Sequence, residues 1–179
     1  MTEAVSNCLT ERHLMLFGAI IRWFARYELL MQEIMACVAE SDCSVVTLLT
    51  HGLNFSEKRQ TLLNLLRHRM IPLDRFDQVN NYLMIPHTLT RLRNEIAHAE
   101  WVAGTGPNSI QPDWILRPQP SVKPLYDGIE APDKKDVECE EDKVVYTLED
   151  LNEIVETLTA NYAGFSDYLR EKRLINVRT

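Results

Sequence analysis

The chain has 179 residues, 45% of them hydrophobic and 25% charged, which is typical of a soluble globular protein with a single core. Its longest apolar run, residues 14–21, is far shorter than the roughly 20 residues that cross a bilayer, and no basic segment precedes it. We therefore expect neither a membrane span nor a secretion signal. The cysteines lack the spacing of zinc or redox pairs and predict reduced cytoplasmic thiols, with no metal and no cofactor: Cys8, Cys37, Cys43 and Cys139.

The formal net charge of −7 is distributed unevenly. Residues 1–100 carry 10 Lys and Arg against 11 Asp and Glu, whereas residues 101–179 carry 9 against 15, so the acidity lies in the second half. Residues 58–93 hold seven cations and only two acids. This local excess predicts a basic surface suited to a phosphate backbone or, as the simpler alternative, a solvated basic face.

Hydrophobic periodicity predicts two helices before Pro72. In residues 10–40, apolar side chains recur at steps of four and three along one stripe, and no proline interrupts it. A short apolar patch, residues 45–49, follows. The second helix is expected to begin near Asn54 or Ser56, either of which can accept an unpaired backbone amide, and to end before the proline.

Residues 73–100 predict a third helical region with a kink or a restart at Pro86, which lacks an amide donor. Its second half combines an apolar stripe with an opposite polar arc. The apolar residues step by four and three: Ile85, Leu89, Leu92, Ile96 and Ala99. The polar residues step likewise and lie within an arc of about 60° at about 100° per residue: His87, Arg91, Asn94 and His98.

Residues 101–146 hold six of the eight prolines and are not expected to be helical. Strand fragments are predicted at residues 114–116 and 144–146, with a hairpin arm at residues 137–139. The acidic stretch at residues 130–142 predicts a solvated loop.

The final helix is marked by Thr147, whose hydroxyl can accept an unpaired amide while Asp150 reaches back. From Leu151 to Leu169 the apolar residues again step by four and three, which suits packing within a helical bundle. The sequence therefore predicts a single, mainly helical domain interrupted by a proline-rich excursion.

The polar arc is the constellation best suited to carry a reaction. Histidine can take and give a proton near neutral pH, and guanidinium holds phosphate oxygens through two parallel hydrogen bonds. RNA supplies its own nucleophile, the 2′-hydroxyl, so its cleavage requires a base, an acid and donors but no metal. Arg93 lies about 140° around the helix from His98, so it must bend to reach it, whereas Asn94 precedes His98 by one turn.

The string RNEIAH, residues 93–98, resembles the motif of the HEPN superfamily. The nuclease branch of that superfamily carries an arginine, a polar residue directly after it, and a histidine after a gap of four to six. Here Arg93 and Asn94 precede His98 with a gap of four. The resemblance covers the helix order of residues 10–100 and 147–172. It implies an all-α four-helix bundle of HEPN type, with residues 101–146 as a proline-rich, partly β excursion.

The resemblance further implies a metal-independent endoribonuclease acting as a homodimer with a composite site. His98 would be the general acid or base, Arg93 would steady the phosphate, and Asn94 would orient one of them. Arg91 and His87, from the same polar arc, would add to the RNA-facing surface. Many such nucleases are toxins or phage-defence effectors, which implies an antitoxin as a further protein partner.

The alternative is a non-catalytic helical interaction or scaffold protein. In that interpretation Arg93 and His98 stabilise a bundle or dimer interface, and the overall acidity weakens general affinity for nucleic acid. The remaining histidines lack acidic or cationic partners at a useful spacing and are expected on the surface: His13, His51 and His68.

Overall fold

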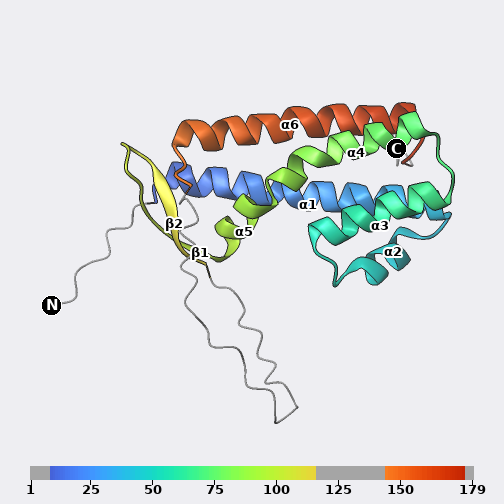
Figure 1. The fold of residues 1–179 in the computed structure, drawn as a ribbon, viewed down its shortest axis with the longest axis horizontal. Coiled ribbons are helices and arrows are strands. Elements are labelled where there is room, and N and C mark those ends of the chain that lie inside the picture. The colour runs from blue at the N-terminus through green and yellow to red at the C-terminus, as the bar shows by residue number, and fades with distance from the viewer. Residues whose placement is uncertain (1–8, 116–143, 176–179) are drawn as a thin grey trace, which may run out of the picture.

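The computed structural model describes residues 9–115 and 144–175 (Figure 1). Most of these residues are helical, which confirms the expectation of a mainly helical fold. No helix in these two ranges is long and apolar enough to cross a membrane. The elements in chain order are α1 (Glu11–Ala39), α2 (Cys43–Thr50), α3 (Phe55–His68), α4 (Leu73–Thr88), α5 (Thr90–His98), β1 (Ala99–Ala103), β2 (Ile110–Ile115) and α6 (Leu148–Glu171).

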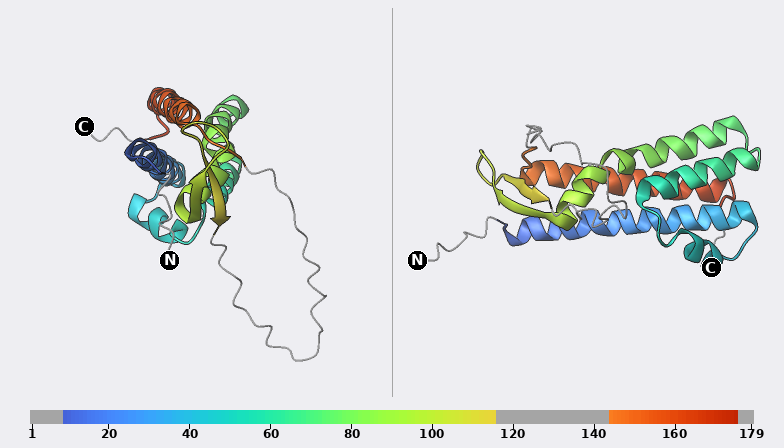
Figure 2. Two further views of the ribbon diagram at one scale, coloured as in Figure 1. Left: turned by 90° about the vertical axis from the view of Figure 1, so that its left-hand side faces the viewer. Right: turned by 60° about the horizontal axis from the view of Figure 1, so that its bottom comes forward.

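The helices α1, α3, α4 and α6 lie side by side around one apolar core (Figure 2). The predicted stripes of the first and last helices both face this core. Phe24 and Tyr27 of α1 are buried there, as are Leu158 and Phe165 of α6. Burying each such side chain stabilises the fold by about 1.5 to 3 kcal/mol, which makes the α1–α6 contact a principal source of stability.

Side-chain caps fix where the long helices begin. The Thr10 and Asn54 side chains accept backbone amides at the starts of α1 and α3. At the start of α6, Thr147 Oγ1 accepts from the amide of Asp150, whose carboxylate accepts from the amide of Thr147 at 2.8 Å. This backbone hydrogen bond holds the pKa of Asp150 below its ordinary value. The predicted helix starts are therefore confirmed at these positions.

The apolar patch at residues 45–49 forms part of α2, a helix that periodicity does not resolve. Asp42 caps it by accepting from the Ser44 amide at 2.7 Å. The hydrophobic side chains Leu48 and Leu49 point into solvent rather than into the core, since they are 78% and 74% exposed. A short helix with only part of its apolar surface buried gives too weak a pattern for a sequence-based assignment.

The predicted interruption near Pro86 is confirmed, although the backbone leaves the helical path three residues later, at Leu89. Pro86 has no amide to donate to the carbonyl four residues earlier, that of Tyr82. Asn161 of α6 replaces the missing donor, because its Nδ2 donates to that carbonyl at 2.8 Å. The same nitrogen donates to the Tyr27 hydroxyl at 2.6 Å, and that hydroxyl donates to the Leu158 carbonyl at 3.2 Å.

The excursion begins with an antiparallel hairpin of β1 and β2, with a register shift between Glu100 and Trp101. The prediction of helix as far as Glu100 is therefore wrong, because the chain turns extended at Ala99 to pair with β2. Trp114 and Ile115 of the predicted strand at residues 114–116 belong to the longer strand β2. The predicted strand at residues 144–146 does not form, because of these residues Tyr146 alone pairs, through an isolated backbone bridge with Ile110. Leu116, the predicted arm at residues 137–139 and the predicted loop at residues 130–142 lie outside the described residues.

His13 is buried rather than at the surface, which contradicts the expectation for this residue. Its Nδ1 accepts the Thr10 amide at 3.1 Å and completes the cap of α1, and its Nε2 lies 3.3 Å from the carbonyl of Asn108 in the hairpin turn. The imidazole thus ties the start of α1 to the hairpin. His51 and His68 are exposed as expected.

Candidate functional site

The motif residues lie on α5, a nine-residue helix that contacts α1, α4 and the hairpin. No side chain caps its start, so packing must hold it in place. Leu92 faces the core and is 3% exposed. Asn94 and His98 are exposed, and α5 therefore presents a polar face to solvent on a buried base.

Arg93 and Asn94 are joined by a hydrogen bond. The Arg93 guanidinium donates through Nη1 to Asn94 Oδ1 at 3.1 Å, which draws it toward the side of α5 that carries His98 one turn later. The offset of about 140° between Arg93 and His98 remains, and no hydrogen bond joins these two side chains. His98 makes no hydrogen bond with any residue of the two described ranges, so its ring is open to a ligand.

Beneath this face lies a buried carboxylate that sequence reasoning did not select. Glu95 is 1% exposed. Its Oε1 accepts from Arg91 Nε at 2.8 Å and its Oε2 accepts from the Tyr146 hydroxyl at 3.1 Å. Burial, together with the Glu95 carboxylate, raises the pKa of Tyr146 above its ordinary value, so the phenol remains a donor at neutral pH.

The Glu95 cluster, meaning Arg91, Glu95 and Tyr146, fixes the rotation of α5 about its own axis. Two of its members stand one helical turn apart on α5, and the third enters from the segment just before α6. Trp101 of β1 packs against Tyr146 with ring centroids 6.0 Å apart. The direction in which Arg93, Asn94 and His98 point is thus set in part by the contacts of Arg91 and Glu95, which occupy neighbouring positions around the same helix.

Arg91 therefore has a structural partner in addition to its predicted role at the surface. Its side chain is 54% exposed although its Nε pairs with Glu95, so one end of the guanidinium is anchored while the side chain still meets solvent. A cation held in this way is ordered before any phosphate arrives, which lowers the entropic cost of binding one.

His87 does not lie on the same helix as the other three residues of the predicted polar arc. The arc assumed one uninterrupted helix, but the break at Leu89 places His87 on α4 and Arg91, Asn94 and His98 on α5. His87 is half-buried, and its Nδ1 lies 3.4 Å from Ser56 Oγ of α3. The single arc of about 60° is therefore wrong for His87.

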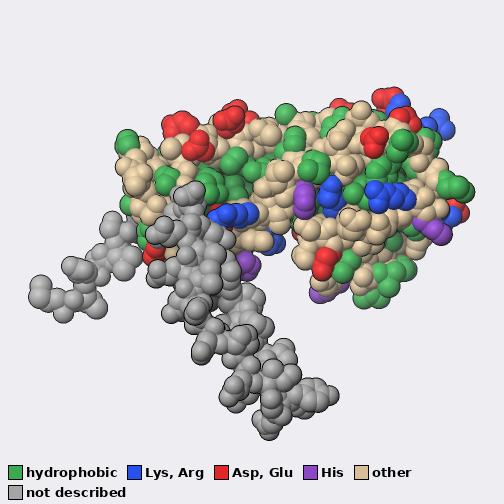
Figure 3. Space-filling model, in the orientation of Figure 1, with side chains coloured by type: hydrophobic (Ala, Val, Ile, Leu, Met, Phe, Trp, Pro, Cys, Tyr) green, Lys and Arg blue, Asp and Glu red, His purple; other side chains and the backbone are tan. Residues whose placement is uncertain are grey.

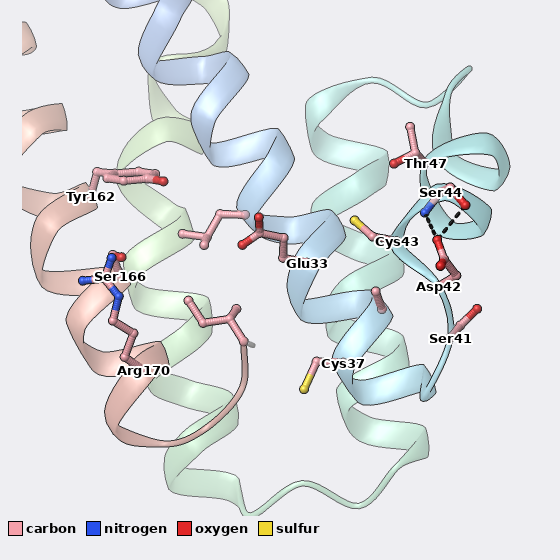
Figure 4. A pocket seen from close by; sticks show the side chains of 13 residues that line it. Glu33, Cys37, Ser41, Asp42, Cys43, Ser44, Thr47, Tyr162, Ser166 and Arg170 are labelled. Atoms are coloured by element: carbon pink, nitrogen blue, oxygen red, sulfur yellow. Dashed lines mark hydrogen bonds between the residues drawn. The ribbon is translucent and has the colours of Figure 1, made fainter. Parts of the chain in front are cut away.

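A cavity of about 710 Å³ opens elsewhere, between α1, α2 and α6 (Figure 4). Its lining includes the free thiols Cys37 and Cys43, with Glu33 and Arg170 also at its wall. None of the predicted site residues lines it. Within residues 9–115 and 144–175, no three His, Cys, Asp or Glu side chains are grouped so as to hold a metal ion.

The sequence contained a signal for Glu95 but not for Tyr146. Glu95 stands three residues after Leu92 and four before Ala99, so it falls at the edge of the apolar stripe, and it follows Arg91 by one helical turn. A carboxylate at an inward position with a cation at that spacing predicts a buried ion pair. Tyr146 is separated from Glu95 by 51 residues, and no local pattern connects them.

Comparison of the chain with known protein families, with curated proteins and with solved structures finds no match.

Proposed function

We propose that this chain is a metal-independent endoribonuclease of HEPN type, with Arg93, Asn94 and His98 as its site. The observation that supports this function best is the set of side chains on the exposed face of α5. An imidazole without a protein partner in the described ranges stands one turn from an amide that orients a guanidinium. These groups meet two requirements of RNA cleavage, proton transfer and charge stabilisation at phosphate.

In this scheme His98 removes the proton from a ribose 2′-hydroxyl, and the 2′-oxygen attacks the adjacent phosphorus. The bond from phosphorus to the 5′-oxygen breaks, leaving a 2′,3′-cyclic phosphate, and the departing oxygen takes a proton from a general acid. Arg93 stabilises the charge on the phosphoryl oxygens. Asn94 holds the guanidinium in position through its Oδ1.

One copy of the chain offers one imidazole on this face, whereas the scheme uses both a base and an acid. A homodimer that brings two copies of α5 together supplies the second His98 and doubles the positive charge around one phosphate. A cytoplasmic role as a toxin or phage-defence effector, restrained by an antitoxin protein, belongs to the same proposal.

The test is incubation of the purified protein with RNA in the presence of EDTA. We expect cleavage that persists in chelator, leaves cyclic phosphate ends, and falls by at least about 100-fold in His98→Ala, the usual contribution of a general acid or base. The cleavage of RNA should fall comparably in Arg93→Ala. The matched control is His51→Ala, which removes another exposed histidine and should retain full activity. Equal cleavage by the wild type and His98→Ala would refute the assignment of this site.

A non-catalytic scaffold is the second candidate, and the Glu95 cluster favours it, since α5 is anchored as a structural helix would be. That function predicts no cleavage by the wild type and a dimer that dissociates, or a lower Tm, in Arg93→Ala. Sedimentation and thermal unfolding of Arg93→Ala beside the wild type distinguish the two candidates. A stable Arg93→Ala dimer that has lost RNA cleavage supports the nuclease.

A further inference from the structure

The line of contact between α3 and α4, called here the α3–α4 seam, carries arginines that lie outside the motif. The two helices run antiparallel and contact each other along this line. At one end Ser56 of α3 faces His87 of α4, and at the other end Arg67 of α3 lies over Phe76 of α4. Arg59 lies between these two contacts.

Both seam arginines are held in place by side chains of α4. Arg59 Nη2 donates to Asn80 Oδ1 at 2.6 Å and approaches Met84 Sδ at 3.1 Å. Arg67 stacks its guanidinium over the Phe76 ring at 4.8 Å from the centroid and is exposed. Burial lowers the pKa of Arg59, but a guanidinium stays charged at neutral pH.

These arginines continue the line that begins at the motif. His87 ends the seam next to the break at Leu89, and α5 carries the chain onward to His98. Figure 3 shows Lys, Arg and His side chains in one row across this face, over α5, α4 and α3. At about 1.5 Å per residue, Arg59 and Arg67 are about 12 Å apart along α3, so the row is longer than one nucleotide.

One cation of the basic segment, Lys58, does not belong to this row. Lys58 points inward, is 7% exposed and pairs with Glu28 of α1. Acidic side chains gather on α6, which contains six Asp and Glu and one Arg, and in Figure 3 they follow its edge of the molecule. A polyanion is therefore attracted to the seam and repelled from α6.

We propose that the α3–α4 seam is the binding track for the RNA strand beyond the scissile linkage, with Arg59 and Arg67 as phosphate-binding residues. This inference rests on the proposed function. It adds that the substrate is an RNA long enough to run from His98 to Arg67, rather than a dinucleotide or a mononucleotide. Binding along the track depends on the backbone phosphates and not on base identity.

The test compares KM for an RNA of 20 nucleotides with KM for a dinucleotide, in the wild type and in Arg67→Gln. Because a dinucleotide at His98 does not extend to Arg67, we expect KM for the long RNA to rise about five-fold while kcat/KM for the dinucleotide is unchanged. Binding of the long RNA is also measured with His98→Ala, which should not cleave it. Adding Arg67→Gln to this variant should remove about one phosphate contact. The slope of log K against log salt then becomes shallower by about 0.7.

Arg26→Gln is the matched control. Arg26 is also exposed and stacked on aromatic rings, 5.1 Å from Trp23 and 5.4 Å from Tyr162, but it lies on α1 and contacts α6. It should leave the KM of both substrates and the salt slope unchanged. Asp77→Asn is expected to change the affinity for the long RNA in the opposite direction. Asp77 shares the side of α4 that carries Met84, so its neutralisation should tighten binding of the long RNA.

The track is overturned if Arg67→Gln and Arg26→Gln affect the long RNA equally, or if Arg67→Gln reduces activity on both substrates alike. In either case, RNA cleavage that is lost in His98→Ala still supports the proposed function. If the wild type neither binds nor cleaves RNA, both proposals fail together. Binding of polyglutamate that requires Arg67, with RNA binding indifferent to Arg67, overturns the track in favour of an acidic protein partner.

Discussion

The helices α5 and α6 achieve their positions in opposite ways. The 24 residues of α6 begin with a reciprocal cap and bury Leu158 and Phe165 completely. The nine residues of α5 have no side-chain cap and depend on a buried carboxylate held by Arg91 and Tyr146. The longer helix is thus specified mainly by its own sequence, and the shorter one mainly by its neighbours.

This difference explains how a polar helix can present a reactive face. Apolar stripes such as that of α6 stabilise a helix, but their contacts are not directional and define its rotation about its own axis only loosely. A hydrogen-bonded carboxylate is directional, so Glu95 fixes the orientation of α5 more narrowly than another leucine would. The cost is that the position of α5 depends on Tyr146, a residue far away in the sequence.

The largest expected effect concerns the α6 side of the comparison. Leu158→Ala removes a side chain with no solvent exposure and should lower the free energy of unfolding by about 3 to 4 kcal/mol, from lost burial and the cavity left behind. Leu29→Ala is the control, because Leu29 is 59% exposed, and it should change stability by less than about 0.5 kcal/mol. Urea denaturation measures both. Similar losses for the two variants would contradict the packing described for α6.

A smaller effect links α6 to the break before α5. Asn161→Ala leaves the Tyr82 carbonyl without the donor that replaces the amide missing at Pro86, and should cost about 1 to 3 kcal/mol. In a Pro86→Ala background the backbone can supply that amide, so Asn161→Ala should cost about 1 kcal/mol less. A double-mutant cycle on the free energy of unfolding gives this coupling. Strict additivity would show that Asn161 does not compensate for the proline.

The smallest effect compares two phenols at alkaline pH, that of the buried Tyr27 and that of the partly buried Tyr146. Burial raises the pKa of Tyr27 to about 12, and it raises that of Tyr146 as well. A tyrosine ionises near pH 10 in the unfolded chain. Above pH 10 the unfolded state therefore releases protons that the folded state keeps, and stability falls by about 1 kcal/mol per pH unit for each phenol.

Below pH 10 these two groups should contribute no pH dependence. Tyr27→Phe and Tyr146→Phe should each reduce the loss of stability between pH 10 and 12, as measured by urea denaturation at a series of pH values. If Tyr146→Phe left the alkaline slope unchanged while Tyr27→Phe reduced it, the phenol of the Glu95 cluster would be ionising freely in the folded protein.

The sequence predicted those parts of the fold that local patterns determine. The stripes and caps of α1 and α6 follow from side-chain spacing and from the hydroxyls of Thr10 and Thr147. The interruption near Pro86 follows from a missing amide. Each of these signals lies within a few residues of its consequence, which is why periodicity and capping rules detect it.

The parts that were missed depend on distant partners. The burial of His13 requires the Asn108 carbonyl, and the strand at Ala99 requires β2. At the candidate site the motif itself was visible, but its support by Glu95 and Tyr146 and the separation of His87 were not. Side chains that act through long-range contacts leave only a weak local signature in a single sequence.

The hydrogen bond from Tyr27 to the Leu158 carbonyl joins residues 131 positions apart and has a consequence for biosynthesis. At roughly 5 to 20 residues per second, a ribosome requires on the order of 10 s to make the intervening chain. During that interval the apolar stripe of α1 lacks the helix that finally covers it. The nascent chain is then a candidate for chaperone binding, and we expect the core to close only after α6 has left the exit tunnel.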